Sequence, residues 1–449
     1  MSARKQPNVL VFFTDQQRWD IMGLHGNPMN LTPNLDRMAR EGTHCANAFS
    51  CQPVCVPARL CLQTGRYASQ FGGYDNRTSQ LPEGVPGLGD RFREAGYRTG
   101  YIGKWHLVKQ NPVPAGRRGG HEYWLGSNVL EFTSDAYRTR VFDNDDNPVD
   151  LPGFRVDALT DAAIRYMDDN KEEPFFLTCS FIEPHFQNSR DDYPAPTGYE
   201  QRYLDPWTPP DLRALGGSSA RHLPGYYGMV KRLDEALGRM LDALRSLGLL
   251  EDTIVLFITD HGCHFKTRNG EYKRSCHESS VRIPMALSGP GFFAGGCLPE
   301  LVSLIDVPPT LLEACGIPVP EDMQGRSILP LTRGRVADWP EEVYIEMHCE
   351  HLSRCVRTHR WKYSVRHTEP GPAPSKDWTF VEDCLYDLRA DPYELNNLVG
   401  FSSHREVADV MRERLVRRMQ GAGEPAPNIV NAEERPGGQK TVSEGEVRQ

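Results

Sequence analysis

Three features that often reveal a protein's partner are missing from this 449-residue chain. It has no block of consecutive basic residues and a formal net charge of −9, so nucleic acid is not an expected partner. No apolar run is long enough to span a membrane, and we expect no membrane partner. The 12 cysteines include no C-x-x-C pair, the spacing common to redox and zinc motifs.

The N-terminus also lacks the features of a secretory leader. In "MSARKQPNVLVFFTDQQ" the basic residues precede an apolar run of only about six residues, and no small-residue cleavage site follows. We therefore predict a buried strand here and a cytoplasmic protein, whose scattered cysteines are mostly small buried hydrophobic residues. Disulfides stay open as an alternative if the natural protein carries a leader ahead of this sequence.

What the chain does contain is an alternation of apolar strands and helices over its first three-quarters. Strands are predicted at Asn8–Asp15, Pro174–Phe181 and Thr253–Asp260, and the longest helix near Gly225–Leu247. This pattern predicts an α/β fold, a doubly wound mixed sheet flanked by helices. In such sheets the functional groups gather at the carboxyl ends of the strands.

The composition divides the chain into three parts. Residues 1–335 form the predicted catalytic α/β domain, and residues 336–420 a smaller α+β subdomain with an antiparallel sheet and a helix. Residues 421–449 are a polar tail rich in glycine and proline, which we expect to be loosely ordered.

The stretch "CQPVCVPARLCLQTGR" (Cys51–Arg66) places a thiol where an anion would be stabilised. We predict that Cys55 is a helix N-cap and that Arg59 lies one turn later on the same face, so both the helix dipole and the guanidinium favour negative charge. An ordinary buried cysteine is one alternative. A phosphatase-type loop needs five residues between cysteine and arginine, where this chain has three. A metal knuckle of Cys51, Cys55 and Cys61 does not match zinc spacing.

The same stretch resembles the sulfatase signature, C-x-P-x-R followed by T-G-R. The motifs "NVLVFFTDQQ", "GKWH", "EPH", "ITDHG", "KRSCHESSVRIP" and "LYDLRADPYELNNL" follow in that family's order, over roughly Asn8–Leu398. The resemblance implies an alkaline phosphatase-like fold and a sulfuric ester hydrolase that releases inorganic sulfate from a small-molecule or saccharide sulfate ester. It also implies that a formylglycine-generating or anaerobic maturase enzyme oxidises Cys55 to formylglycine.

Two apolar strands that end in acids predict a metal site. Asp15 and Asp260 follow parallel strands, and carboxylates at neighbouring strand ends can share one hard cation. With Gln16 and His261 beside them and an oxygen derived from Cys55, they would hold one divalent ion. We expect Ca²⁺, with Mn²⁺ or Mg²⁺ as alternatives. The competing interpretation is that strand-end acids cap helices or close turns.

Further site residues are assigned by the resemblance. It implies that Lys104 and Lys273 bind the anion, that His185 protonates the leaving alcohol, and that His106 serves the formylglycine diol as a base. Asn76 is a candidate for binding the substrate. His264 and Arg282 are candidates for supporting positions.

Two departures from the common sulfatase pattern keep a second activity open. Many sulfatases have an acid where Gln16 stands and an asparagine where His261 stands. Asp-Gln and Asp-His also occur in related hydrolases of phosphonate monoesters and phosphodiesters, which form the alternative function. A non-catalytic anion or sugar binder with an unmodified Cys55 is the third hypothesis. The loops Asn111–Pro152 and Gln187–Leu223 would determine specificity.

Overall fold

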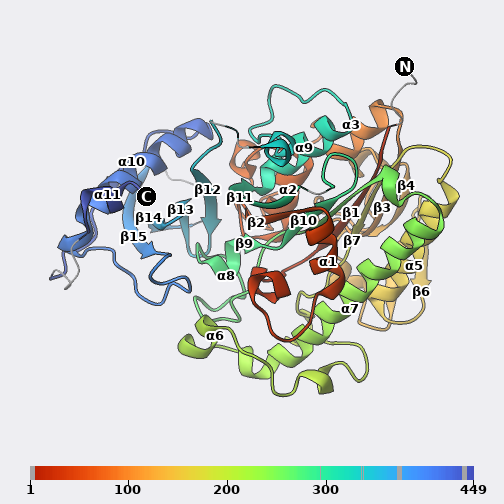
Figure 1. Ribbon diagram of the computed structural model, residues 1–449, viewed down its shortest axis with the longest axis horizontal. Helices are drawn as coiled ribbons and strands as arrows, with labels where there is room; N and C mark the ends of the chain where they lie inside the picture. Colours follow the sequence, from red (N-terminus) through yellow and green to blue (C-terminus); the bar gives the residue numbers. More distant parts are fainter. Residues whose placement is uncertain (1–5, 294, 335, 337, 372–376, 437–441) are drawn as a thin grey trace.

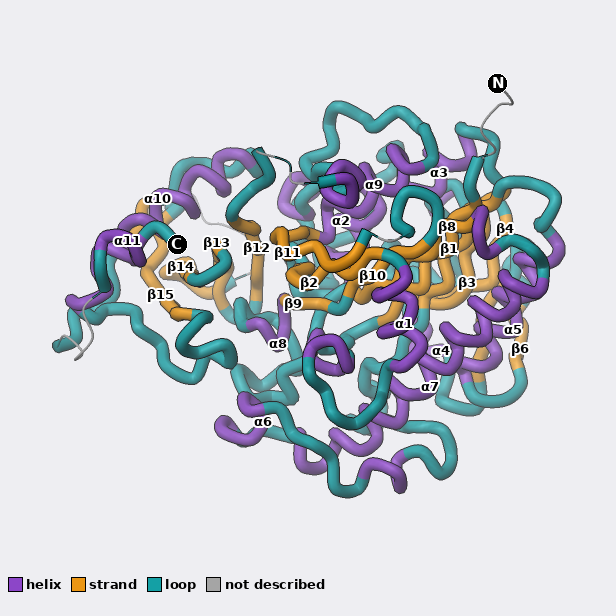
Figure 2. The backbone as a smooth tube through the Cα atoms, viewed as in Figure 1, coloured by secondary structure: helices purple, strands orange, loops and turns teal. Residues whose placement is uncertain are grey.

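Two separate β-sheets organise the chain, as the computed structural model shows (Figures 1 and 2). The structure describes residues 6–293, 295–334, 336, 338–371, 377–436 and 442–449. The predicted domain boundary lies between residues 335 and 336. Residues 335 and 337, on either side of it, are outside the described residues.

The larger sheet is mixed, as predicted, and runs in the order β11-β2-β10-β8-β1-β7-β3-β4-β5-β6, with β9 paired to β2. At its centre β1 is parallel to both β7 and β8, whereas β10 is antiparallel to both β2 and β8. Central strands covered on both faces need continuous apolar sequence, which these have. The strands are β1 (Asn8–Thr14), β2 (Thr43–Phe49), β3 (Arg98–Lys104), β4 (Tyr123–Ser127), β5 (Thr139–Phe142), β6 (Pro148–Leu151), β7 (Phe175–Ser180), β8 (Thr253–Thr259), β9 (Arg282–Ile283), β10 (Met285–Ser288) and β11 (Gly296–Ser303).

Helices cover both faces of this sheet (Figure 1). One face carries α1 (Pro33–Glu41), α5 (Arg155–Asp169) and α7 (Ser219–Ser246), and the other carries α2 (Cys55–Thr64), α3 (Leu88–Glu94) and α9 (Val307–Ala314). Alternate residues of β1 enter two different cores, because strand side chains point to opposite faces. Leu10 and Phe12 join the first core, and Val11 and Phe13 join the second. The doubly wound arrangement predicted from the sequence is therefore confirmed.

The second sheet is formed by the C-terminal quarter, in the order β12-β13-β14-β15-β16. Its strands are β12 (Glu342–His348), β13 (His351–Thr358), β14 (Trp361–Pro370), β15 (Thr379–Asp387) and β16 (Asn428–Val430). The helix α10 (Arg405–Gly421) packs against it through Val407, Met411 and Leu415. The smaller C-terminal α+β unit is thus present with its own core.

The expectation of a loosely ordered tail is wrong for two segments of it. Asn428–Val430 adds β16 in parallel to β15, and α11 (Glu444–Val447) buries Val447 in the core of the small sheet. Backbone pairing and apolar contacts with the core of the small sheet, to which Ala422, Ile429 and Ala432 also contribute, outweigh the polar composition here. Residues 437–441 of the predicted tail lie outside the described residues.

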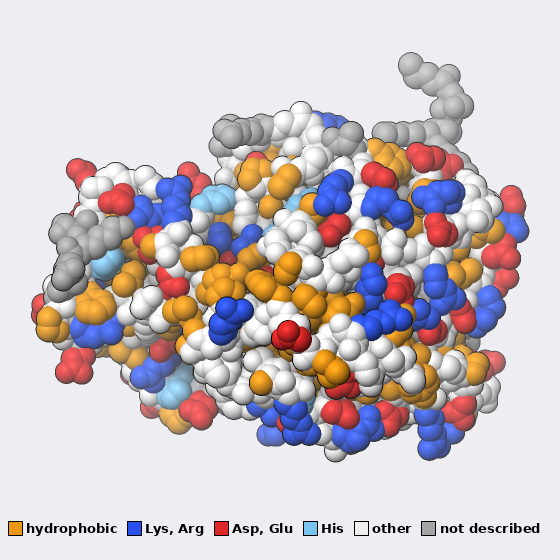
Figure 3. Space-filling view, turned by 60° about the horizontal axis from the view of Figure 1, so that its bottom comes forward, with side chains coloured by type: hydrophobic (Ala, Val, Ile, Leu, Met, Phe, Trp, Pro, Cys, Tyr) orange, Lys and Arg blue, Asp and Glu red, His pale blue; other side chains and the backbone are white. Residues whose placement is uncertain are grey.

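The face of the molecule seen in Figure 3 has no large area of charge of one sign. Figure 3 shows lysine and arginine side chains interspersed with acidic ones, and apolar side chains gathered in a band across the centre. Within the described ranges no helix combines the length and the apolar character needed to cross a membrane.

Candidate active site

The site begins where two central strands end. Strands β1 and β8 run in parallel with Thr14 opposite Thr259, so the following residues, Asp15 and Asp260, reach the same edge of the sheet. Asp260 Oδ1 accepts hydrogen bonds from the backbone N–H groups of Gln16 (3.1 Å) and His261 (2.9 Å). Gln16 has φ 65°, a strained value for a non-glycine residue that a site can retain when it positions a side chain.

Cys55 is brought to this edge by α2. The helix begins at Cys55 with Val54 in the cap position, so the predicted N-cap assignment is wrong by one residue. The sulfur lies 2.9 Å from Lys273 Nζ, 3.3 Å from His261 Nε2 and 3.6 Å from Asp15 Oδ1. Burial opposes ionisation, but Lys273, Lys104 and His261 hold the pKa of Cys55 well below its usual value. The structure thus places position 55 in a strongly positive field.

Four side chains converge in a geometry that suits a metal ion. Ligand atoms of Asp15, Cys55, Asp260 and His261 all lie within 4.8 Å of one another, and all four residues are buried. Asp260 Oδ2 and Gln16 Oε1 are buried with no hydrogen-bond partner among the described residues. Burial and the nearby Asp15 raise the pKa of Asp260 to about 7. Gln16 Oε1, without a partner, and the Asp260 carboxylate, held by backbone N–H groups and an ion pair, fit a divalent cation with oxygen and nitrogen ligands.

Arg59 and Lys104 hold the acids in place. Arg59 contacts Asp15 Oδ2 at 3.0 Å through Nη2 and Asp260 Oδ2 at 3.4 Å through Nε. Lys104 Nζ lies 2.8 Å from Asp15 Oδ2 and 2.9 Å from Glu131 Oε1. Burial opposes both charges, yet Asp15 and Glu131 raise the pKa of Lys104 above its usual value. Both cations therefore remain charged beside the anion position.

Lys273 connects Cys55 with two histidines. Its Nζ lies 3.2 Å from His185 Nε2 and 3.2 Å from His261 Nε2. His185 Nδ1 lies 2.7 Å from the carbonyl oxygen of Phe186, which leaves Nε2 facing the site. His264 Nε2 contacts the carbonyl oxygen of Lys273 at 2.9 Å and so supports the loop.

Of the remaining predicted residues, His106 and Asn76 lie beside Cys55 and Arg282 does not. His106 hydrogen-bonds Cys55, and burial with Lys104 nearby lowers its pKa. The chain does not stay extended from Lys104 to His106, because β3 ends at Lys104 and His106 has φ 60°. Asn76 Oδ1 accepts a hydrogen bond from the backbone N–H of Val56 (3.0 Å) and so caps the first turn of α2 beside Cys55. Arg282 instead stacks over the Trp19 ring at 4.0 Å, outside the cluster.

Sequence reasoning missed three residues that complete this network. Glu131, on the short helix α4 (Leu130–Thr133), pairs with Lys104, and Ser180 Oγ accepts from Arg59 Nη1 at 2.9 Å. Tyr193 Oη accepts from Gln16 Nε2 at 3.0 Å. Only Glu131 gave a signal, since an acid within the apolar run "VLEF" requires a cationic partner if buried.

Comparison with known proteins adds independent information. The family model described as Sulfatase matches residues 7–317, and the one described as N-sulphoglucosamine sulphohydrolase, C-terminal, matches residues 270–421. The chain is 29% identical over 442 residues to an ulvan-active sulfatase of Formosa agariphila, covering 93% of this chain and 82% of the relative. It is 27% identical over 478 residues to an arylsulfatase of Clostridium perfringens, covering 93% and 95%.

Solved structures share the whole architecture. A crystal structure assigned to the sulfatase yidJ of Bacteroides fragilis has a TM-score of 0.83 at 26% identity and covers 95% of this chain and 98% of that one. A phosphonate monoester hydrolase of Agrobacterium radiobacter has a TM-score of 0.71 at 20% identity, covering 93% and 96%. At that identity the likeness concerns the fold alone.

Proposed function

The chain belongs to the sulfatase family and is a sulfuric ester hydrolase with an alkaline phosphatase-like fold, and we propose that it acts through formylglycine derived from Cys55 and one divalent metal ion. The observation that carries this proposal is the setting of Cys55, whose sulfur lies 2.9 Å from Lys273, 3.3 Å from His261 and 3.6 Å from Asp15. Position 55 is thus held between cations and the candidate metal ligands.

The chemistry needs a better nucleophile than an ordinary side chain. A hydrated aldehyde at position 55 would supply two hydroxyls on one carbon, and a metal ion held by Asp15, Gln16, Asp260 and His261 would acidify one of them. Arg59, Lys104 and Lys273 would neutralise the negative oxygens of the sulfate group. We propose Ca²⁺ for the ion, with Mn²⁺ or Mg²⁺ as alternatives, because three of the four side chains offer oxygen.

Proton transfers fall to the two histidines beside position 55. His185 Nε2 faces Lys273 Nζ at 3.2 Å, which supports a role in protonating the departing alcohol. His106 contacts position 55 directly and has a lowered pKa through burial, so its neutral form can accept a proton from the diol. Regenerating the aldehyde in this way would expel sulfate without a second attack on sulfur.

For the substrate we propose a saccharide sulfate ester. The family model that matches residues 270–421 is named for an N-sulphoglucosamine sulphohydrolase, and one relative is named as ulvan-active. A phosphonate monoester or phosphodiester hydrolase remains the second candidate, because Gln16 and His261 make the site less acidic than the common sulfatase pattern. A cytoplasmic location and maturation by a formylglycine-generating or anaerobic maturase enzyme belong to the same proposal.

The test combines mass and turnover. The peptide containing Cys55 from active protein should have the mass of the aldehyde and react with hydrazide reagents, whereas the matched cysteine Cys61 on the same helix should keep its thiol. On this verified protein, sugar and aryl sulfates should be hydrolysed faster than aryl phosphonates and phosphodiesters. A fully active enzyme with the genetically encoded mass at Cys55 would refute the formylglycine proposal, and the opposite ester preference would favour the second candidate.

A further inference from the structure

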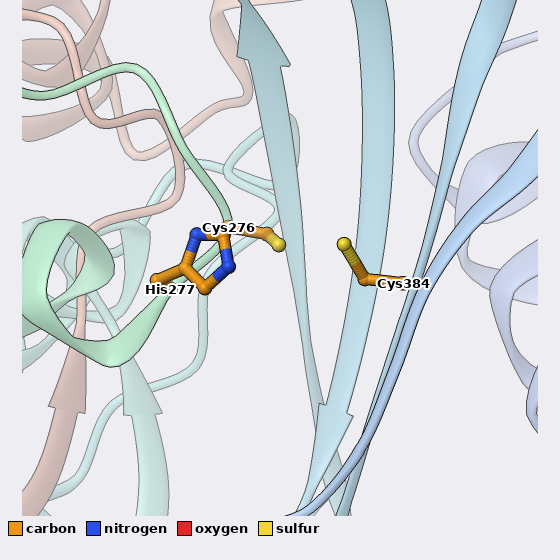
Figure 4. Close-up of side chains that lie close together, drawn as sticks. All are labelled: Cys276, His277 and Cys384. Atoms are coloured by element: carbon orange, nitrogen blue, oxygen red, sulfur yellow. The ribbon is translucent and has the colours of Figure 1, made fainter. Parts of the chain in front are cut away.

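A second cluster of metal-binding side chains lies away from the active site, between the two sheets. Ligand atoms of Cys276, His277 and Cys384 lie within 4.8 Å of one another. Figure 4 shows the two sulfur atoms facing each other and a ring nitrogen of His277 turned toward them. We propose that these residues bind a soft divalent cation, Zn²⁺, that links the two sheets.

The three residues come from two parts of the fold, the large α/β domain and the C-terminal sheet. Cys276 and His277 belong to the loop that precedes α8 (Glu278–Val281), whereas Cys384 lies on β15 of the C-terminal sheet. A third thiol, Cys355 on β13, is a neighbour of Cys276. Thiolate and imidazole are the ligands that zinc prefers, usually in sets of four. Cys276, His277 and Cys384 therefore offer three ligands within 4.8 Å of one another, and Cys355 is a candidate for the fourth.

The distances fit the ion after small side-chain adjustments. Zn–S bonds of about 2.3 Å place two sulfurs of a tetrahedral site about 3.8 Å apart. The ligand atoms now lie within 4.8 Å of one another, a limit about 1 Å longer than that sulfur–sulfur distance. Rotation of the cysteine side chains can shorten the separations by this amount. The second requirement is a free imidazole nitrogen.

His277 can meet this requirement through Nε2, the ring nitrogen on the side of the sulfurs in Figure 4. Nε2 lies 3.1 Å from Tyr386 Oη, so an ion would take its lone pair in place of the tyrosine hydroxyl. Nδ1 is buried without a hydrogen-bond partner within the described part of the chain and would carry the ring proton.

The surroundings of the cluster allow an ion to enter. Lys362 Nζ donates to the carbonyl oxygen of Cys276 at 2.8 Å and so holds the loop, while its charge is paired with Glu278 and Glu394. Cys276 and His277 also line a hollow of about 370 Å³, which gives an ion a path from solvent.

Two other interpretations compete with the metal. The cysteines also belong to an apolar cluster with Phe49, Ile345 and Met347, so they could be simple packing residues. Packing alone accounts for the sulfurs but not for a histidine nitrogen turned toward them. A Cys276–Cys384 disulfide would use two sulfurs and leave both Cys355 and His277 without a role.

The site would also steady the active-site loop. Cys276 is three residues after Lys273, whose Nζ contacts Cys55. A zinc ion shared with β15 would anchor that loop to the C-terminal sheet. Loss of the ion should therefore lower the melting temperature and weaken turnover, without removing any group that touches the substrate.

The experiment counts zinc in the full chain with the active-site thiol removed. Cys55→Ser protein, saturated with Ca²⁺ and then equilibrated with Zn²⁺, should retain about one zinc per chain after gel filtration, measured by elemental mass spectrometry. Adding Cys384→Ser or Cys276→Ser should abolish the retained zinc, and adding Cys315→Ser, at a buried cysteine outside the cluster, should not. Co²⁺ in place of zinc should give thiolate charge-transfer absorption that Cys384→Ser removes.

Cysteine protection keeps the test valid if a variant fails to fold. In the folded Cys55→Ser protein, zinc should slow alkylation of Cys276, Cys384 and Cys355 at least tenfold, read peptide by peptide, and leave the rate at Cys315 unchanged. Equal alkylation with and without zinc would overturn the proposal. So would a Cys276–Cys384 disulfide in unreduced peptides, or the same zinc content with and without Cys384→Ser.

Discussion

Lys273 Nζ lies 2.9 Å from Cys55 Sγ, although 218 residues separate them in the chain. The contact joins the start of α2 to a loop between β8 and α8, and it brings a cation to the side chain that we propose is oxidised to formylglycine. The same ammonium group reaches His185 and His261 at 3.2 Å. In the proposed mechanism, charge placed here would act on the nucleophile, the leaving group and the metal ligands together.

Replacing Lys273 should therefore remove more than one interaction. We expect Lys273→Ala to lower kcat about 10²–10³-fold, because one preorganised charge beside the developing anion is lost. Steady-state kinetics on an aryl sulfate would measure this. The control is Lys171→Ala, which removes a surface lysine that pairs with Asp168. Equal activity of both variants would mean that Lys273 has no role in the reaction.

His185 should matter most when the leaving alcohol is a poor one. A general acid contributes typically 10²–10⁴-fold, and the benefit grows as the leaving group becomes more basic. We expect His185→Asn to slow hydrolysis of an alkyl or sugar sulfate strongly, and that of a nitrophenyl sulfate much less. The measurement is kcat/KM across a series of leaving-group pKa values. An unchanged slope in the variant would exclude proton donation by His185.

Some of this site could be predicted from sequence, because its parts follow regular elements. Asp15 and Asp260 each end an apolar strand, and the parallel pairing of β1 with β8 places them together. Cys55 and Arg59 are four residues apart in one helix, so one helical turn places them on the same face. These residues were predictable because strand ends and helix faces have fixed geometry.

The rest depends on conformations that a pattern does not specify. His106 turns into a positive φ immediately after β3, and Glu131 reaches Lys104 from a four-residue helix. Loops are positioned by tertiary contacts, so their residues could be assigned by resemblance but not placed. The prediction of a loosely ordered tail failed for the same reason. A three-residue strand and a buried valine hardly change the composition of residues 421–449.

Glu382 should make the stability of the small lobe depend on pH. Burial opposes its charge, but hydrogen bonds from Arg405 and Arg412 and from the backbone N–H of Ala432 lower its pKa from 4.5 to about 2. A carboxyl with a lowered folded-state pKa stabilises the native state above its unfolded-state pKa, and that stabilisation disappears as the pH falls. The relevant window therefore runs from about pH 5 down to about pH 2.

The corresponding variant is Glu382→Gln. We expect it to lower the free energy of unfolding by about 2–3 kcal/mol at pH 7 and by progressively less below pH 5. Urea unfolding followed by circular dichroism across this range would measure the difference. Glu413→Gln, at an exposed position on α10, should change stability little at any pH. A loss for Glu382→Gln that stays constant from pH 7 to pH 3 would contradict the electrostatic explanation.

His261 should influence which metal ion the active site prefers. Its Nε2 lies 3.5 Å from Asp260 Oδ1 and 3.8 Å from Asp15 Oδ1, close enough for one ion to contact all three residues. Imidazole nitrogen suits Mn²⁺ better than Ca²⁺, whereas an amide oxygen suits Ca²⁺. We expect His261→Asn to shift the ratio of the Mn²⁺ and Ca²⁺ dissociation constants about tenfold toward Ca²⁺. Chelator-treated protein, titrated with each ion and followed by its melting temperature, gives both constants.

The control is His359→Asn, at an exposed turn of the small sheet, which should leave the ratio unchanged. If His261→Asn behaved like that control, the imidazole would not be a ligand, and the buried oxygens of Asp15, Gln16 and Asp260 would have to hold the ion without it.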